Sequence, residues 1–351
     1  MILKKVIIIS STFSKNKRGG VASYIDNRAL YLSKKVEVIV YGLGKSYKQD
    51  NVDYKSIGDP SRFRYTFLIN WMQLIIFCLK QRGAIIEIHN IPVALPIFFL
   101  FRNRYFFHGP ARLEAKAEKR SKAQQNICYF LEKVSLKLSN KIFVISDNFK
   151  DVLKSEHPYI KTRILKKLPV YKFNKEFFDS KIATTDHLNF IIVRRLVKRT
   201  GVIEFVKLFI MMLKTEKIEE NSLLTIAGEG PEQDILIKLI ATSGFENNIK
   251  YLGVISEKKK IDLFKMADFN IVPTLKLEGF GLVIIEAGIC GCKSIVTNVG
   301  AMPEVIKYLS NQGILFDLNE SSCVKTFSTL KKNIYCKEEL HKLTKEKFYF
   351  N

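Results

Sequence analysis

Short apolar runs alternate with amphipathic stretches along the first half of the chain. The apolar runs predict buried strands at residues 5–10, 36–41, 84–89, 104–108 and 141–146. Helical patterns separate them at residues 21–33, 67–81, 111–139 and 147–155. This alternation predicts a parallel sheet with helices on both faces, a fold in which ligands bind at the carboxyl ends of the strands.

The second half of the chain repeats this plan. Strands are predicted at residues 189–193, 223–227, 250–252, 269–272, 294–297 and 313–316, and helices at 200–213, 231–242 and 258–266. The periodicity lapses between residues 166 and 186, and a chain of 351 residues exceeds the usual size of one core. We therefore predict Rossmann-like domains at residues 1–170 and 171–335, with residues 336–351 crossing back to the first domain.

The segment that follows the predicted strand 269–272 carries the most specific chemistry. Glu278 precedes the glycine turn Gly279-Phe280-Gly281, and a helix opens at Leu282. Backbone amides of such a turn and the positive end of the helix suit a diphosphate. Glu286 lies one helical turn beyond Leu282 on the same face. A nucleotide sugar would offer phosphates to the turn and hydroxyl groups to both carboxylates, whereas the alternative is an ordinary turn with a partly solvated glutamate.

The positive charge of the chain lies mainly in its first half. The formal net charge is +23, of which residues 1–180 carry +19. This split indicates an anionic partner. Because no nucleic-acid-binding motif is present, an anionic membrane surface is favoured over nucleic acid. The apolar stretches 66–79 and 91–101 are shorter than the ~20 residues of a spanning helix, so they predict core helices in a peripheral protein.

The cysteines favour a reducing compartment. Six cysteines form no recognisable disulfide framework, and residues 2–10 are too short for a secretory signal. Cys290 and Cys292 lack a second ligand pair, so no zinc site is expected. We predict a cytoplasmic protein with no metal, located peripherally at the inner face of the cell membrane.

Several segments in a fixed order carry a family resemblance. They are Arg18-Gly19-Gly20-Val21, Phe107-His108-Gly109-Pro110, Val144-Ile145-Ser146, Arg194-Arg195-Leu196-Val197, Ala227-Gly228-Glu229-Gly230-Pro231, Tyr251-Leu252-Gly253, the Glu278/Glu286 block and Gly300-Ala301-Met302-Pro303-Glu304-Val305. Together they resemble glycosyltransferase family 4, which comprises retaining enzymes of the GT-B fold.

The resemblance implies a fold and a reaction. The fold is α/β, with two Rossmann-like domains whose parallel sheets face each other across a central cleft. The reaction is transfer of a hexose from a nucleotide-diphosphate sugar to a glycan or lipid-linked acceptor, with retention of anomeric configuration and no cofactor. The basic first half suggests an acceptor of bacterial surface polysaccharide assembly, such as lipopolysaccharide, capsule or exopolysaccharide.

The resemblance also assigns residues. The catalytic candidates are Glu278 at the sugar ring, His108 at the donor sugar or its phosphate, and Arg195 and Arg199 at the diphosphate. The donor-binding candidates are Gly19, Gly20, Gly228, Val254, Gly279, Phe280, Gly281, Leu282 and Glu286, the last on the ribose. His89 also follows a strand and ranks below His108.

The basic loop departs from the family pattern. Arg194 replaces the usual glycine, and Thr200 stands where a lysine is common. The sequence therefore leaves open which of Arg194, Arg195, Lys198 and Arg199 contacts the diphosphate.

Other functions remain open at this stage. A catalytically silent nucleotide-sugar-binding or scaffold protein on the same fold is the main alternative. A nucleic-acid binder using the basic half is another, and one scaffold can also host a phosphorylase or an epimerase.

Overall fold

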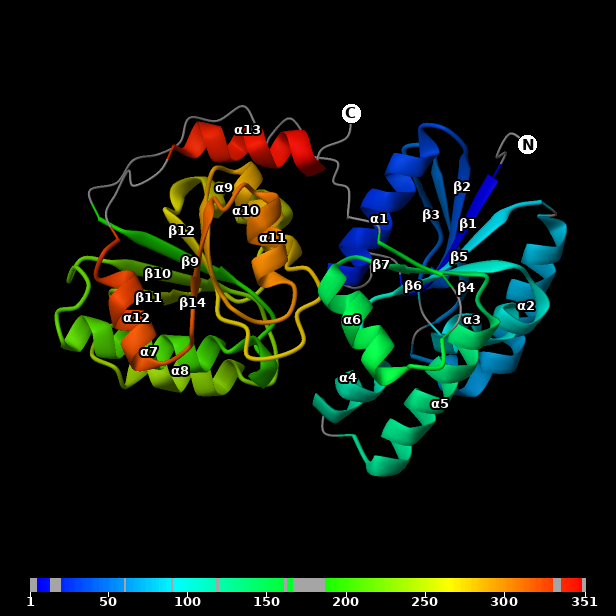
Figure 1. Ribbon diagram of the computed structural model, residues 1–351, viewed down its shortest axis with the longest axis horizontal. Helices are drawn as coiled ribbons and strands as arrows, with labels where there is room; N and C mark the ends of the chain where they lie inside the picture. The colour runs from blue at the N-terminus through cyan, green and yellow to red at the C-terminus, as the bar shows by residue number, and fades with distance from the viewer. Residues whose placement is uncertain are drawn as a thin grey trace. The chain divides into compact units, whose positions relative to one another are not determined.

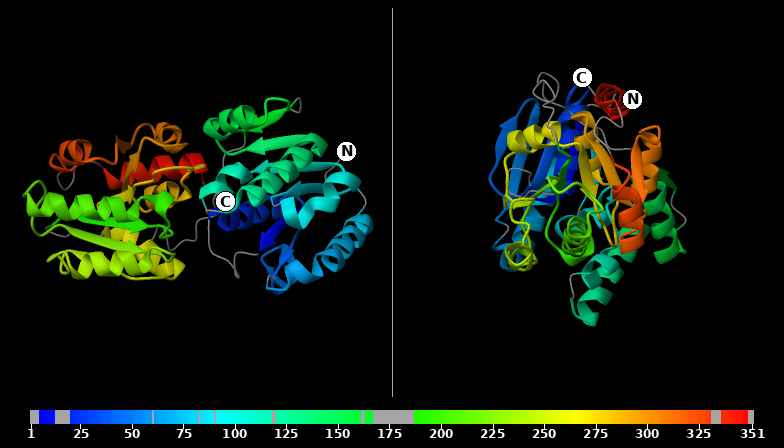
Figure 2. Two further views of the ribbon diagram at one scale, coloured as in Figure 1. Left: turned by 90° about the horizontal axis from the view of Figure 1, so that it is seen from below. Right: turned by 90° about the vertical axis from the view of Figure 1, so that its left-hand side faces the viewer.

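The computed structural model describes residues 5–12, 20–59, 61–81, 83–89, 91–117, 120–160, 163–166, 187–330 and 336–348. The chain divides into two compact units, with the division after Lys172. This division and the predicted linker fall within residues 167–186, outside the described residues. Each unit is a sheet with helices on its faces (Figures 1 and 2), which confirms the predicted α/β class.

The first unit contains an eight-stranded sheet in the order β3-β4-β2-β1-β5-β6-β7-β8. Its strands are β1 (Lys5–Thr12), β2 (Glu37–Leu43), β3 (Tyr47–Gln49), β4 (Val52–Gly58), β5 (Ile85–Ile88), β6 (Asn103–Phe107), β7 (Lys141–Val144) and β8 (Ile164–Lys166). All neighbours pair in parallel except β3, which is antiparallel to β4. The sequence patterns missed β3, β4 and β8.

Six α-helices of the first unit lie in the described part of the chain. They are α1 (Gly20–Ser33), α2 (Phe63–Lys80), α3 (Ile91–Leu100), α4 (Ala111–Ala117), α5 (Lys122–Leu138) and α6 (Asp147–Glu156). Helix α1 packs on β1 and β2, while α2 packs on α3 and α3 on α5. Across the described ranges, no helix is long and apolar enough to cross a membrane.

One expectation for this unit was wrong. Residues 111–139 do not form one helix but two, α4 and α5. The Ser121 side chain accepts a hydrogen bond from the Gln124 amide, and the Gln124 side chain accepts one from the Ser121 amide. This reciprocal capping box satisfies otherwise unpaired donors at a helix start, so it fixes the beginning of α5.

The second unit contains a six-stranded parallel sheet in the order β11-β10-β9-β12-β13-β14. Its strands are β9 (Asn189–Val193), β10 (Leu223–Ala227), β11 (Ile249–Tyr251), β12 (Phe269–Val272), β13 (Lys293–Thr297) and β14 (Gly313–Phe316). Every strand predicted for this half lies within one residue of its observed position.

The helices of the second unit divide between the two faces of its sheet. They are the 3₁₀ turn η2 (Lys198–Thr200), α7 (Val202–Lys214), α8 (Gln233–Ala241), α9 (Glu257–Met266), α10 (Leu282–Ile289), α11 (Met302–Tyr308), α12 (Glu320–Phe327) and α13 (Lys337–Phe348). Helices α7 and α8 cover one face, whereas α9, α10 and α13 lie on the other (Figure 1). The last helix, α13, packs on α10.

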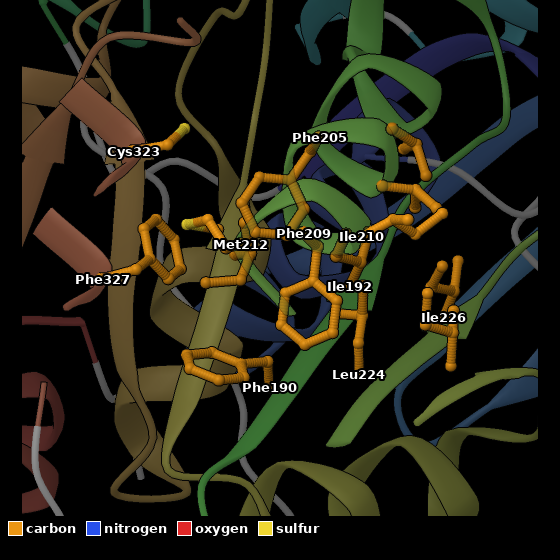
Figure 3. Close-up of a cluster of buried hydrophobic side chains, with 14 of the residues drawn as sticks. Phe190, Ile192, Phe205, Phe209, Ile210, Met212, Leu224, Ile226, Cys323 and Phe327 are labelled. Carbon is orange, nitrogen blue, oxygen red and sulfur yellow. The ribbon is translucent and has the colours of Figure 1, made fainter. Parts of the chain in front are cut away.

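An aromatic cluster joins α7 and α12 to the sheet. Phe190 of β9 meets Phe209 of α7 and Phe327 of α12, each with a ring-centroid distance of 5.7 Å. Phe205 lies 5.4 Å from Phe327, and the four rings point toward one another (Figure 3). These side chains are almost fully buried, so the cluster anchors β9 between α7 and α12 near its amino end, and the site begins at the opposite end of the strand.

Phe209→Ala should destabilise the second unit, because truncating a fully buried ring leaves a cavity among its neighbours. We expect a loss of about 3–5 kcal/mol in the free energy of unfolding, measured by denaturant titration. Ile237→Ala on α8, where the side chain is 46% exposed, is the matched control and should change it by about 0.5 kcal/mol or less. Equal losses in both variants would contradict this account of the core.

Candidate active site

The strand order of the second sheet reverses between β9 and β12. Chain segments leaving these two neighbouring strands diverge, and the crevice between them is the usual ligand site of an open parallel sheet. Arg194 directly follows β9, while Thr274 and Glu278 follow β12. The fold thus brings together residues 80 and 84 positions apart in the chain.

Glu278 forms a buried ion pair at this crevice. Its Oε2 lies 2.5 Å from a terminal nitrogen of Arg194, which also donates to the hydroxyl of Thr274 at 2.9 Å. The other carboxylate oxygen accepts from the Gly281 amide at 3.1 Å. The side chains of Glu278 and Arg194 are 15% and 10% exposed. Glu278 is therefore held by two groups that could also hold an anionic ligand.

These contacts keep Glu278 ionised. Burial is the largest single influence and raises the pKa of its carboxyl, whereas the charge and hydrogen bond of Arg194 lower it. Arg199 and the Gly281 amide lower it further, so the pKa lies below its ordinary value. A carboxylate that stays charged can stabilise positive charge on a sugar ring.

The glycine turn adopts a conformation that requires glycine at its last position. Gly281 is the N-cap of α10 with φ of 70°, and a Cβ there would lie 2.5 Å from Cε of Met302. The ring of Phe280 is 1% exposed and packs against Tyr308 and Phe348. Phe280 was predicted to bind the donor. Because its ring is buried, it can contact a ligand only through its backbone. Leu282 begins α10, whose positive end faces the turn.

Glu286, which was predicted to bind a ribose, forms an ion pair with a lysine in this structure. Its Oε2 lies 3.1 Å from Nζ of Lys260 on α9, which also contacts Glu257 at 2.7 Å. Burial lowers the pKa of Lys260, but Glu286 and Glu257 outweigh it and raise the pKa above its usual value. Lys260 carried no signal in the sequence, because one lysine among Lys258, Lys259 and Lys260 resembles an ordinary solvated helix face.

In the basic loop after β9, the cation that contacts Glu278 is Arg194 and not Arg195. Arg194, which the sequence did not single out, pairs with Glu278, whereas the side chain of Arg195 is exposed. Arg199 donates to the Leu277 carbonyl at 3.0 Å and so braces the loop that carries Glu278. The hydroxyl of Thr200 is committed to the carbonyls of Arg195 and Val197.

The predicted donor-binding residues Gly228 and Val254 lie at neighbouring strand ends of the second sheet. The Gly228 amide donates to the Gly253 carbonyl at 2.8 Å, which joins the ends of β10 and β11 beside exposed Val254. Gly228 has φ of 132°, and a Cβ there would lie 1.9 Å from the Arg194 carbonyl oxygen. The backbone of the Arg194 loop can pass this closely only because residue 228 is glycine.

In the first unit, two histidines meet at adjacent strand ends. His89 follows β5 and His108 follows β6, and Nδ1 of His89 lies 2.8 Å from Nε2 of His108. Burial lowers the pKa of His108 to about 4. Gly20 begins α1, whereas Gly19 lies outside the described residues.

No group of three or more potential metal ligands was found in the ranges that the structure describes. The charged groups of the candidate site are instead arranged in pairs, Glu278 with Arg194 and Glu286 with Lys260.

Solved structures share the fold of this chain, and a family profile matches its second unit. The Anabaena protein HepE, solved in complex with UDP and glucose, superposes with a TM-score of 0.73 at 14% identity, over 99% of this chain and 96% of that one. This likeness confirms the predicted GT-B class. Residues 173–346 match the sequence profile of the glycosyl transferases group 1 family. The second unit is thus similar to that family over nearly its whole length.

Curated relatives match parts of the chain. N-acetyl-alpha-D-glucosaminyl L-malate synthase of Bacillus anthracis is 32% identical over 126 residues, which are 35% of this chain and 31% of that protein. O-antigen chain mannosyltransferase B of Escherichia coli is 33% identical over 95 residues, 27% of this chain and 24% of that protein. The matched segments thus span less than a third of each of these relatives.

Arg194→Gln should raise the pKa of Glu278, because it removes the charge that opposes burial. A carboxyl with a lowered pKa stabilises the fold above its unfolded-state pKa, and this contribution disappears as pH falls through the folded-state pKa. We expect the variant to lose about 1–3 kcal/mol of unfolding free energy at neutral pH, and less as the pH falls.

Carbon-13 NMR titration of the carboxyl and denaturant titrations at several pH values measure both effects. Arg195→Gln removes the same charge one residue along from an exposed position, and it should change neither quantity appreciably. A Glu278 pKa that stays the same in Arg194→Gln would show that Arg194 does not control its ionisation.

Proposed function

We propose that this protein is a retaining glycosyltransferase that moves a hexose from a nucleotide-diphosphate sugar to a glycan or lipid-linked acceptor. The observation that carries the proposal is Glu278, an ionised carboxylate at the mouth of a glycine turn, between a guanidinium and the start of α10. The match of residues 173–346 to the glycosyl transferases group 1 family supports the reaction class. The name of the E. coli relative supports a role in bacterial surface polysaccharide synthesis.

The donor would replace some of the contacts that the side chains of the site now make with one another. Its diphosphate would take the Gly281 amide and the positive end of α10, now used in part by Glu278. Arg199 and the neighbouring Arg195 supply further positive charge in the same loop. Because the fold holds the Gly281 amide, the start of α10 and Arg199 in place, these three groups can stabilise the charge that develops on the leaving phosphate.

Once displaced from the Gly281 amide, Glu278 would face the sugar ring. There it would stabilise the positive charge that develops at the anomeric centre, and the leaving phosphate would take the acceptor proton on the same face. Glu286 would bind the ribose hydroxyls, with Lys260 as its neighbour in the unliganded protein. No cofactor is required for this chemistry.

The first unit is proposed to present the acceptor at an anionic membrane surface. On the exposed face of α2, Leu68, Met72, Ile76 and Leu79 recur every three or four residues and are 46–63% exposed. Helix α3, which packs on α2, ends in exposed Phe99 and Leu100. An apolar stripe in a region of +19 formal charge suits insertion between anionic headgroups. The proposed location is the cytoplasmic face of the cell membrane.

A thermal-shift screen against nucleotide sugars tests the donor. Selective binding should raise the melting temperature for one nucleotide sugar above the others, since a ligand that binds only the folded state stabilises it. With that donor, Glu278→Gln should retain a measurable shift but lose about 10²–10³-fold in turnover.

Glu320→Gln, at an exposed position on α12, is the matched control and should keep full turnover. Binding of a donor with unchanged turnover in Glu278→Gln would favour the catalytically silent alternative. Salt-sensitive retention on DNA with no shift by any nucleotide sugar would favour a nucleic-acid binder.

Co-sedimentation with vesicles tests the membrane surface. The protein should bind phosphatidylglycerol vesicles at physiological salt and bind phosphatidylcholine vesicles much more weakly. Leu68→Asp combined with Met72→Asp should reduce binding about tenfold or more, because two apolar side chains no longer insert.

The matched control places Asp at Ile235 and Ile237, which are 54% and 46% exposed on α8 of the second unit. This double variant should bind like the unaltered protein. A protein that ignores anionic vesicles, or equal losses in both double variants, would refute this membrane surface.

A further inference from the structure

His89 and His108 form a two-ring contact at the carboxyl edge of the first sheet. Nδ1 of His89 lies 2.8 Å from Nε2 of His108, and the two ring planes differ by 29° with a centroid distance of 5.1 Å. The ring of Phe106 stacks on His89 at 4.5 Å, and Tyr24 makes an edge-to-face contact with His108 at 5.3 Å. His89 is 6% exposed. The orientation of both rings is therefore set by packing.

The site lies where the strand order of this sheet reverses. Strand β1 pairs with β2 on one side and with β5 on the other, and His89 follows β5 directly, with its amide bonded to the Ile9 carbonyl. His108 follows the next strand, β6. In an open parallel sheet this edge is where ligands bind. The histidine pair therefore lies at the candidate ligand crevice of the first unit.

Both rings are neutral at physiological pH. Burial, the neighbouring ring and the charge of Arg28 lower the pKa of His89, and burial lowers that of His108. The other charged groups nearby are balanced, because Arg28 is bonded to Glu87 through two contacts of 2.6 Å. Arg104 lies 3.9 Å from the same carboxylate. Between two neutral rings, one of the two facing nitrogens must carry the proton of the hydrogen bond and the other must accept it.

The surroundings of His89 decide which ring donates that proton. Nε2 of His89 is buried and has no hydrogen-bond partner within the described residues. If His108 donated, His89 would have to carry its proton on Nε2, as a buried N–H without an acceptor. If His89 donates through Nδ1, Nε2 is only an unused acceptor. Orphaned buried N–H groups are rarer than unused acceptors, so donation by His89 is favoured.

We propose that His89 is a positioning residue that fixes His108 in the Nδ1–H tautomer. His108 then presents an N–H donor, and its Nε2 is occupied by His89. An N–H suits a phosphate oxygen or a sugar hydroxyl oxygen, whereas a bare nitrogen would repel an anion. This role rests on the proposed function and on the expectation from the sequence that His108 contacts the donor sugar or its phosphate. Fixing the tautomer removes the need to reorient a proton when the ligand binds.

Long-range nitrogen-15 NMR correlation of the histidine rings tests the tautomer without any substrate. In the unaltered protein, His108 should show a protonated Nδ1 and a bare Nε2. His89→Asn keeps a side-chain N–H at the position of Nδ1 and should preserve this pattern. His89→Leu removes the donor, so the Nε2–H form of His108 should become populated.

The kinetic expectation follows the same order. His89→Leu should lower kcat/KM about 10–100-fold, the usual effect of removing a residue that orients a functional histidine, and His89→Asn should recover most of it. His157, which bonds to Glu132 and Tyr159 in the same unit, is the internal control, and its signals should not change in either variant.

Outcomes of the two readouts separate this inference from the proposed reaction. A protonated Nε2 on His108 in the unaltered protein would overturn the inference, whatever the activity. Full activity in His89→Leu despite a changed tautomer would overturn the positioning role. If no nucleotide sugar were turned over at all, the NMR result would still decide the tautomer, while the proposed function alone would fail. Should His89→Leu not fold, the unaltered protein and His89→Asn carry the test.

Discussion

Both sheets reverse their strand order once, at β1 in the first unit and at β9 in the second. The reversal follows from the right-handedness of crossovers between parallel strands, because strands added in opposite directions place their helices on opposite faces. At that point the loops on the carboxyl edge diverge and leave room for a ligand. Arg194 and Glu278 lie at the reversal of the second sheet, and His89 lies at that of the first. The chemistry of each unit thus depends on its topology.

Charge compensation is the second theme of the site. Buried ions are costly unless they are paired, and three acidic side chains of the described residues have a cation as partner: Glu278 has Arg194, Glu286 has Lys260 and Glu87 has Arg28. A ligand that enters the second unit must therefore exchange partners with these pairs. The affinity of the ligand reflects the difference between the contacts it makes and the ion-pair contacts it replaces. A ligand whose polar groups fit these side chains poorly would therefore bind much more weakly.

The sequence predicted the parts of this protein that depend on local pattern. Apolar runs located every strand of the second sheet, and the glycine turn with Glu278 was recognised because its residues are adjacent in the chain. Long-range pairing was not predictable. The pairing of Arg194 with Glu278 and of Lys260 with Glu286 became visible only once β9 lay beside β12 and α9 beside α10. The same holds for His89, whose partner is 19 residues away. Strands β3 and β8 were missed because each has three residues, none of which is buried.

The packing of α13 on α10 has a mechanical consequence. A Cβ at Gly288 of α10 would lie 2.7 Å from the hydroxyl oxygen of Thr344, so the two helices approach closely at that glycine. Further along, Phe348 presses edge-on against Phe280, the middle residue of the glycine turn. Helix α13 therefore supports the glycine turn from behind. Forces on the C-terminal part of the chain would be transmitted to the backbone amides that face the candidate ligand.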